Sequence, residues 1–598
     1  MMATHAKEAL ARFEREHDVE PEGRFHIGLA VLVSATAIVM AFAPMNWVPL
    51  AFFGLVPLLA VTRGLSDAAV FRTALAFGFF MNLGGFPWVA QLMVDFGGFP
   101  WVAGFFFLCL LCLHHGLVPA LAFWVGRKVE RGLGWRHGMA LPMTYVAAEF
   151  LVPIIFPWRM GHSQVFHLNY LQLAELGGVH LMTFGVVLIN LGLYHLIRSV
   201  RSRELQGVAD VPRVSWLALG FFLFSQAYGV VRVQQVERAQ ESLPTLRVAL
   251  IEGDIPIEEK WDAALFQRNL LTYQKLSVEA VEQGAELVIW PESAFEVGDF
   301  IYYAGPDEKL ESSSSVERTV VRFPQSSAPF GSGEFALPRI ERASPQRNFT
   351  TPLLAGTTTY RRTSPDEWPL LPPINRETPR RVMFYNSSIL LDSEGVVEGI
   401  VDKVVLMPLS ETMPAGEWLY RTTGFNIFSL NSAFGLFGKG PGPEVMRHKV
   451  DASLSEEGHI RIGILNCYED LMPGFVRTMQ KTRQPHFMVN QTNDAWFGRE
   501  IAPPQHMALA VPRAVEARTW LLRATNTGVS TFVDASGRVR ARSSVYDPEV
   551  LIYDVPLKEA PRTPYIAFGE WVAFGSIAFV GVGLWRRRAQ RSGVAKKR

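Results

Sequence analysis

Long apolar runs alternate with short polar segments through residues 27–231, and one further apolar run lies near the C-terminus. A helix needs about 20 apolar residues to cross the hydrocarbon core of a bilayer. The runs therefore predict eight transmembrane helices, several of which are bounded by Pro or Gly. The predicted spans cover residues 27–44, 47–62, 73–93, 101–125, 139–156, 177–197, 214–231 and 566–585.

The pattern changes between residues 232 and 565. Short β-rich runs such as "TLRVALIEGD", "AELVIWPESAF" and "HIRIGILNCYED" alternate there with helical stretches, including 265–283 and 505–522. Strand-like runs at such intervals, broken by helices, are typical of an α/β sandwich with buried sheets. Residues 303–350 differ, because they are rich in Ser, Pro and charge, and they predict an irregular surface insertion.

These patterns predict four segments along the chain. Residues 1–25 are charged, and they are too long and acidic for a cleaved signal peptide, so they read as an N-terminal tail. Residues 26–231 form a membrane domain of seven helices, and 232–565 form a globular domain. Residues 566–598 hold the last transmembrane helix and a basic tail.

Composition and charge narrow the function classes. Hydrophobic residues make up 49% of the chain and charged residues only 19%, which agrees with several membrane segments. The net charge of +1, from 57 basic and 56 acidic residues, gives no reason to expect nucleic-acid binding. Three cysteines cannot form a disulfide framework.

The distribution of basic residues predicts the orientation in the membrane. Short loops rich in Lys and Arg stay in the cytoplasm. Basic residues gather after the fourth span, after the sixth span and after the eighth span, whereas the loops around 44–47 and 91–100 hold none. With eight spans, every basic loop and both termini fall on the cytoplasmic side. The globular domain at 232–565 is then exported.

Three polar residues stand at the ends of apolar runs in the globular domain: Glu292 in "VIWPESAF", Lys403 in "EGIVDKVVLMP" and Cys467 in "GILNCYED". Active-site groups commonly project from strand ends of an α/β sheet. A thiol reacts poorly until it is deprotonated, a carboxylate can take its proton, and an ammonium can stabilise a thiolate or an oxyanion. The three residues suffice for acyl transfer through a thioester.

Each of the three also has an ordinary structural reading. Cys467 could be a small buried hydrophobe, Glu292 a helix cap and Lys403 a surface charge. The predicted compartment favours use of the cysteine, because an unpaired thiol in an exported domain is exposed to oxidation.

Several longer motifs occur in a fixed order along almost the whole chain. They are "FPWRMGHSQ", "EGDIPIEEKWD", "WPESAF", "DKVVLMPLSE", "NCYEDLMP", "NQTNDAWFG", "LLRATNTGVS" and "TPYIAFGEW". In these motifs the chain resembles the apolipoprotein N-acyltransferases, bacterial inner-membrane enzymes whose exported domain belongs to the nitrilase superfamily. The resemblance implies eight transmembrane helices and an inserted α-β-β-α sandwich.

The resemblance also implies roles for single residues. Glu292 matches the general base, Lys403 the lysine that stabilises the intermediate, and Cys467 the nucleophile. Supporting and entrance positions are matched by Glu411, Tyr468, Glu469 and Trp261, the last on a loop at the entrance of the site. The family has an aromatic residue and a glycine before the second glutamate, where this chain has Leu409 and Ser410, so a differently shaped loop is expected there.

The implied activity is transfer of a fatty acyl chain from a membrane phospholipid to the N-terminal α-amino group of the diacylglyceryl-cysteine of an apolipoprotein. The enzyme is expected to be monomeric and to need no cofactor, with its catalytic domain in the periplasm. Two alternatives use the same residues or none: a membrane-tethered amidase that passes the acyl group to water, and a non-catalytic lipoprotein-binding relative.

Other motifs give no second site. The sequence has no metal-ligand spacing, P-loop or dinucleotide fingerprint. His114 and His115 lie within a predicted span and read as a packed pair. The three Asn-x-Ser/Thr triplets that start at Asn348, Asn386 and Asn490 are expected by chance.

Overall fold

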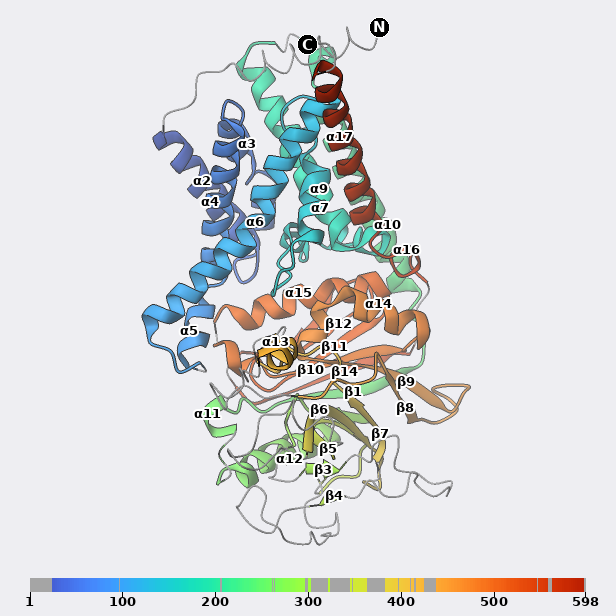
Figure 1. The fold of residues 1–598 in the computed structure, drawn as a ribbon. Coiled ribbons are helices and arrows are strands. Elements are labelled where there is room, and N and C mark those ends of the chain that lie inside the picture. The colour runs from blue at the N-terminus through green and yellow to red at the C-terminus, as the bar shows by residue number, and fades with distance from the viewer. Residues whose placement is uncertain are drawn as a thin grey trace. The chain divides into compact units, whose positions relative to one another are not determined.

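The described chain divides into two compact units in the computed structural model (Figure 1). The first comprises Met1–Glu237, Pro504–Glu516 and Arg562–Arg598, and the second comprises Arg238–Pro503 and Ala517–Pro561. The structure describes residues 24–95, 97–204, 207–260, 262, 264–295, 300–302, 321–322, 345–346, 348–362, 382–395, 397–408, 410–412, 416–423, 437–498, 500–545, 547–557 and 562–595.

The described part of the first unit is helical. Its helices are α2 (Arg24–Ala41), α3 (Val56–Thr62), α4 (Asp67–Gly85), α5 (Trp88–Asp95), α6 (Trp101–Leu133), α7 (Leu141–Leu151), α8 (Leu168–Leu171), α9 (Ala174–Arg201), α10 (Arg213–Arg238), α16 (Pro564–Phe568) and α17 (Trp571–Ala595). Helices α4 and α6 approach closely, since a Cβ atom at Gly78 would lie 2.6 Å from the Cα atom of Gly116. Small residues permit such contacts between membrane helices.

Four of the described helices, α4, α6, α9 and α10, are long and apolar enough to cross a membrane. Shorter apolar helices cover the first two predicted spans, at Phe25–Ala41 and Val48–Thr62. The predicted span 73–93 does not form one helix, because α4 ends at Gly85 and α5 begins at Trp88. Pro87 lies between them, and proline disfavours a helical residue before it. The count of eight spans stays a prediction.

The described part of the second unit contains two β-sheets. In the first sheet the strand order is β14-β1-β2-β5-β3-β4, with β6 paired to β5 and β7 paired to β6. Its strands are β1 (Thr245–Glu252), β2 (Leu287–Ile289), β3 (Phe300–Tyr302), β4 (Val321–Arg322), β5 (Leu353–Arg362), β6 (Val382–Leu391), β7 (Val397–Asp402) and β14 (Glu549–Pro556). Strands β1, β2 and β5 run parallel, so their carboxyl ends meet at one edge.

The second sheet has the order β13-β12-β11-β10-β9-β8. Its strands are β8 (Val445–Lys449), β9 (His459–Asn466), β10 (Phe487–Thr492), β11 (Trp520–Thr525), β12 (Thr531–Val533) and β13 (Val539–Arg542). The three central strands, β9, β10 and β11, are parallel, and β10 and β11 are buried at every position. Full burial explains their uninterrupted apolar character in the sequence.

The two sheets face one another, and helices cover their outer faces. Gln491 of β10 donates from Nε2 to the carbonyl of Trp290, beyond β2, at 2.6 Å. Helix α12 (Phe266–Glu282) packs on the first sheet, and α14 (Pro473–Thr482) packs on the second, where Met479 lies against Gly463. The predicted α/β sandwich is therefore confirmed.

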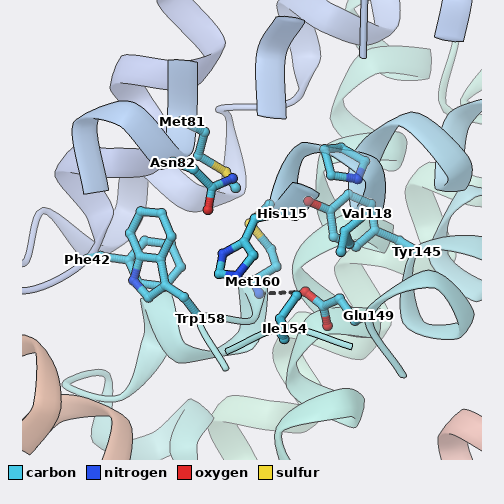
Figure 2. Close-up of a pocket in the computed structure, with 11 residues that line it drawn as sticks. Phe42, Met81, Asn82, His115, Val118, Tyr145, Glu149, Ile154, Trp158 and Met160 are labelled. Atoms are coloured by element: carbon cyan, nitrogen blue, oxygen red, sulfur yellow. Dashed lines mark hydrogen bonds between the residues drawn. The ribbon is translucent and has the colours of Figure 1, made fainter. Parts of the chain in front are cut away.

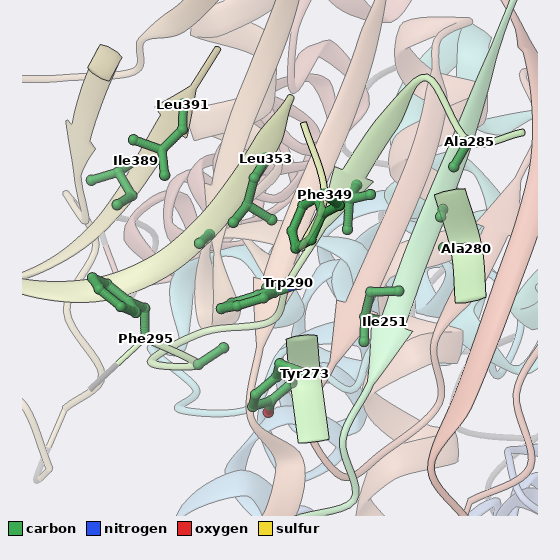
Figure 3. Close-up of a cluster of buried hydrophobic side chains, with 14 of the residues drawn as sticks. Ile251, Tyr273, Ala280, Ala285, Trp290, Phe295, Phe349, Leu353, Ile389 and Leu391 are labelled. Atoms are coloured by element: carbon green, nitrogen blue, oxygen red, sulfur yellow. The ribbon is translucent and has the colours of Figure 1, made fainter. Parts of the chain in front are cut away.

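A cluster of buried apolar side chains between α12 and the first sheet anchors the end of β2 (Figure 3). Trp290 is completely buried there beside Tyr273, with ring centroids 5.2 Å apart, and its Nε1 donates to Ser277 Oγ at 2.8 Å. Burying side chains of this size contributes roughly 2–3 kcal/mol each. The chain leaves this cluster at Pro291, so residue 292 starts from a fixed backbone.

Two sequence predictions in this unit have different outcomes. The helix expected at 265–283 is confirmed as α12. The helix expected at 505–522 is α15 (Ala502–Ala517), which ends earlier, and Trp520–Thr525 form the central strand β11 instead. Arg518 has a φ of 51°, a left-handed conformation that ends the helix. The predicted insertion at 303–350 lies mainly outside the described residues.

Candidate active site

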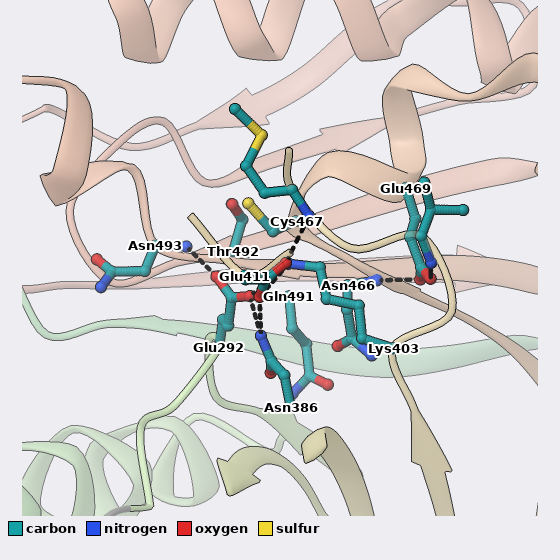
Figure 4. A network of polar contacts seen from close by, with 12 residues as sticks. Glu292, Asn386, Lys403, Glu411, Asn466, Cys467, Glu469, Gln491, Thr492 and Asn493 are labelled. Atoms are coloured by element: carbon teal, nitrogen blue, oxygen red, sulfur yellow. Dashed lines mark hydrogen bonds and ion pairs between the residues drawn. The ribbon is translucent and has the colours of Figure 1, made fainter. Parts of the chain in front are cut away.

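Cys467, Glu292 and Lys403 come together between the two sheets of the second unit (Figure 4). Cys467 follows β9 directly, Lys403 follows β7 directly, and Glu292 follows β2 after Trp290 and Pro291. Their side chains are 8%, 1% and 5% exposed. Three strand ends far apart in the sequence thus deliver a thiol, an ammonium and a carboxylate to one buried place.

Lys403 is held by two carboxylates. Its Nζ lies 3.2 Å from Glu292 Oε1 and 2.9 Å from Glu411 Oε1. Burial alone would lower the pKa of Lys403, but the charges of Glu292 and Glu411 outweigh it and hold this pKa well above its ordinary value. The ammonium therefore stays charged at neutral pH.

Cys467 has the opposite tendency. Burial raises the pKa of the thiol well above its ordinary value, and the negative charge of Glu292 adds to this, while Lys403 opposes it. The resting thiol is therefore neutral, and it requires a base before it can attack. Its backbone has a φ of 48°, a sharp left-handed turn that begins the short 3₁₀ helix Cys467–Leu471.

Glu292 is fixed through both carboxylate oxygens. Oε1 accepts a hydrogen bond from Asn386 Nδ2 at 2.6 Å, and Oε2 accepts one from the backbone N–H of Asn493 at 3.1 Å. Lys260 Nζ donates to the Glu292 carbonyl at 2.9 Å. These contacts orient the carboxylate without neutralising it.

The supporting residues predicted from the sequence have separate outcomes. Glu411 lies at Lys403, and its Oε2 accepts from the Met407 N–H at 2.8 Å. Tyr468 and Glu469 are buried in the turn after Cys467. Trp261 and Leu409 lie outside the described residues.

Glu469 joins the turn of the cysteine to the loop of the lysine. Its Oε1 accepts from the N–H groups of Val404 and Val405 at 2.7 and 2.9 Å, and its Oε2 accepts from Asn466 N at 2.8 Å. Burial raises its pKa to about 7, although these hydrogen bonds act in the opposite direction.

Sequence reasoning missed Asn386 and Asn490, which were dismissed as parts of chance triplets. Asn386 Nδ2 donates to Glu292 and, at 3.0 Å, to Glu411 Oε1, so one amide joins both glutamates. Asn490 Nδ2 donates to the carbonyl oxygen of Cys467 at 2.9 Å. Both residues lie on predicted strands next to the motifs, and that position was the only available signal.

The other candidates give no second reaction centre among the described residues. No group of three His, Cys, Asp or Glu side chains there could hold a metal ion. A cavity of about 20 Å³ in the first unit is lined by His115, Tyr145, Glu149 and Trp158 (Figure 2), and it has room for about one or two water molecules. His114 lies within 2.6 Å of the Pro153 carbonyl.

Residues 247–565, more than half of the chain, match the model of the carbon-nitrogen hydrolase family. The chain belongs to that family. Carbon-nitrogen hydrolases include a solved amidase from Nesterenkonia, which is 18% identical, with 55% of this chain and 95% of the amidase aligned and a TM-score of 0.32.

A second match covers the helical part of this carbon-nitrogen hydrolase. Residues 34–192 match the apolipoprotein N-acyltransferase N-terminal domain. An apolipoprotein N-acyltransferase of Geobacter metallireducens is 28% identical over 94% of this chain and 96% of its own length. One of Azotobacter vinelandii is 27% identical with the same coverage, and one of Chlorobaculum tepidum is 28% identical over 78% and 79%. The resemblance predicted from the motifs is confirmed.

Proposed function

We propose that the protein is an apolipoprotein N-acyltransferase. It moves a fatty acyl chain from a membrane phospholipid, through a thioester on Cys467, to the α-amino group of the diacylglyceryl-cysteine of an apolipoprotein. The observation that carries the proposal is the joint occurrence of a helical region typical of these acyltransferases and a buried Glu, Lys and Cys site. The named relatives align along nearly the whole chain, which supports transfer over plain hydrolysis.

In the first half-reaction Glu292 takes the proton of the Cys467 thiol, and the sulfur attacks the ester carbonyl of the phospholipid. The charged Lys403 stabilises the oxyanion of the tetrahedral intermediate, and a positioned donor of this kind typically contributes ~3 kcal/mol. The C–O bond then breaks, Glu292 returns the proton to the leaving oxygen, and a lysophospholipid departs. A thioester remains on the sulfur.

In the second half-reaction the α-amino group of the lipoprotein attacks the thioester. Glu292 accepts a proton from the attacking nitrogen, the C–S bond breaks, and the thiolate of Cys467 is protonated again. The amide is more stable than the thioester, so the step needs no ATP. A neutral resting thiol beside a permanently charged Lys403 suits both halves, because the acyl group can leave the sulfur as easily as it arrives.

The location in the cell follows from the charge pattern and is part of the proposal. Residues 1–25 form a cytoplasmic tail and 26–231 a membrane domain of seven helices. Residues 232–565 form the periplasmic catalytic domain, and 566–598 add an eighth helix and a cytoplasmic tail. Both substrates carry acyl chains whose transfer into water costs ~0.8 kcal/mol per CH₂, so a membrane-bound monomer in the inner membrane fits the chemistry.

The test is an acyl-transfer assay with the purified protein. A phospholipid with an isotope-labelled acyl chain is mixed with a synthetic diacylglyceryl-cysteine peptide, and both the protein and the peptide are analysed by mass spectrometry. We expect labelled acyl on Cys467 before the peptide is added and on the peptide amine afterwards. Cys467→Ser should abolish both signals, whereas Cys109→Ser should leave them unchanged. Release of the label as free fatty acid while the amine stays unmodified would instead identify a hydrolase.

A further inference from the structure

Arg523 lies completely buried on β11 with two buried carboxylates, and the reaction steps above do not use it. Its guanidinium is paired with Asp470 through Nη1, and its Nη2 lies 3.6 Å from Asp494 Oδ2. All three side chains are 0% exposed. Buried ion pairs of this kind add little net stability compared with apolar residues, so a stability role alone does not account for them.

The same guanidinium reaches the nucleophile through Asn490. Residues 490 and 523 are paired across the parallel strands β10 and β11, which places both side chains on one face of the sheet. Arg523 Nη1 donates to Asn490 Oδ1 at 3.1 Å, and Asn490 Nδ2 donates to the Cys467 carbonyl at 2.9 Å. An arginine cannot accept a hydrogen bond, so it fixes which end of the amide faces Cys467.

Arg523 also holds the far end of the turn that carries the thiol. Asp470 closes the short segment that begins with the left-handed residue Cys467, three positions earlier. A left-handed backbone conformation costs a non-glycine residue roughly 1–2 kcal/mol, and it persists only where surrounding contacts enforce it. One guanidinium thus holds both ends of the turn, through Asn490 at one end and Asp470 at the other.

The contact with Asp494 extends this support to the base. Asp494 follows Asn493, whose N–H donates to Glu292 Oε2 at 3.1 Å (Figure 4). The backbone N–H of Asp494 donates to the Thr527 carbonyl at 3.1 Å, and its Oδ1 accepts from Thr492 Oγ1 at 3.3 Å. Asp494 therefore keeps the Asn493 N–H directed at the carboxylate.

We propose that Arg523 is a positioning residue that sets the relative placement of the Cys467 thiol and the Glu292 carboxylate. It acts through Asn490 and Asp470 on the cysteine and through Asp494 on the glutamate. The inference rests on the proposed function for its kinetic consequence, but the placement itself can be measured without any acyl transfer.

The decisive variant is Arg523→Lys, because lysine keeps the positive charge and loses the planar fork that spans three partners. A displacement of about 1 Å can cost ~100-fold in rate, so we expect single-turnover acylation of Cys467 to fall by about tenfold to 100-fold. The KM for phospholipid should change less than about twofold, since no substrate contact is altered. Arg540→Lys is the matched control: Arg540 pairs with Asp534 on the same sheet and should keep the wild-type rate.

A second readout separates this inference from the proposed function. Alkylation of Cys467 by iodoacetamide needs the thiol and its base but no lipid, and mass spectrometry of the peptide that contains residue 467 excludes Cys109 and Cys112. We expect alkylation at pH 7 to fall by roughly tenfold in Arg523→Lys, with the control unchanged. A protein that alkylates normally but transfers no acyl group would refute the proposed function and leave the placement role intact.

A third variant covers a failure of Arg523→Lys to fold. Asn490→Ala removes only the link to the Cys467 carbonyl and leaves Arg523 paired with both aspartates. It should lower acylation and alkylation by about tenfold, in a protein with a melting temperature close to that of the wild type. Wild-type rates, within about twofold, in either folded variant would overturn the proposal.

Discussion

Glu411 Oε1 lies 2.9 Å from Lys403 Nζ, closer than the 3.2 Å that separates this ammonium from Glu292 Oε1. The loop before Glu411 departs from the family pattern at Leu409 and Ser410, yet the glutamate still reaches the lysine. Two carboxylates on one ammonium leave Glu292 only a partial claim on the charge of Lys403. Glu411 thereby keeps the lysine charged while Glu292 gains and loses protons.

Glu411→Gln should therefore impair catalysis more than folding. The amide keeps the shape and can still accept from the Met407 N–H, but it no longer opposes neutralisation of Lys403 when Glu292 takes up a proton. We expect a loss of about tenfold to 100-fold in kcat for acyl transfer, with the melting temperature nearly unchanged. Glu411→Ala should in addition destabilise the protein by ~3 kcal/mol, because it removes one partner of a buried ion pair.

The matched control for this pair is Glu398→Gln, which removes a carboxylate from His448 in the same unit but away from Cys467. Its kcat should equal that of the wild type. Equal kcat for Glu411→Gln and Glu398→Gln would show that the second carboxylate has no part in the reaction.

Asn386→Asp tests the amide that joins the two glutamates. The substitution places a third carboxylate within about 3 Å of Glu292 and Glu411, where like charges repel strongly in a buried site. We expect activity to fall further than in Asn386→Ala, and by about 100-fold or more relative to the wild type. Thioester formation on Cys467, followed by mass spectrometry, measures the effect.

Asn348→Asp provides the comparison, since Asn348 starts another of the Asn-x-Ser/Thr triplets but is exposed. It should leave thioester formation unchanged. A smaller loss for Asn386→Asp than for Asn386→Ala would mean that the added charge is tolerated and that the amide does not bridge two ionised carboxylates.

The contrast between Cys467 and Asn386 explains how much of this site the sequence could predict. Cys467, Glu292 and Lys403 each end an apolar run, so their chemical type and their place at a strand end are visible locally. Asn386 lies inside β6, and its role depends on which strands lie opposite it. A single sequence does not contain that register.

The same limit applies to the folding units. The periodic runs predicted the sheets and α12, because burial and period act locally. The helix predicted at 505–522 extended too far, because the fully buried strand Trp520–Thr525 is as apolar as a buried helix and only the left-handed Arg518 separates the two. Arg523 on that strand was therefore not considered as part of the site.

Reporter fusions test the predicted orientation. Alkaline phosphatase is active only after export, so a fusion after Gly207, in the basic loop between α9 and α10, should be inactive. A fusion after Ser242, beyond α10, should be active, and β-galactosidase fusions at both positions should give the reverse pattern. Active alkaline phosphatase at Gly207 would place the basic loop outside and refute the exported catalytic domain.

Glu469 makes the stability of the protein depend on pH in a predictable direction. Its folded-state pKa of about 7 lies above the ordinary glutamate value of 4.5, so between these values the folded protein keeps a proton that the unfolded chain has lost. The stabilisation from this proton is fully present below pH 4.5 and is lost as the pH rises through 7. At most it amounts to about 3 kcal/mol, the equivalent of the pKa difference for a fully buried group.

Comparison with Glu469→Gln isolates this contribution, because other buried acids, such as Glu252 with its pKa near 8, are common to both proteins. The variant cannot titrate at residue 469. We therefore expect the wild type to lose melting temperature relative to Glu469→Gln between pH 5 and pH 8, both measured in the same detergent. A constant difference across that range would mean that Glu469 is ionised throughout, held by the N–H groups of Asn466, Val404 and Val405 strongly enough to overcome its burial.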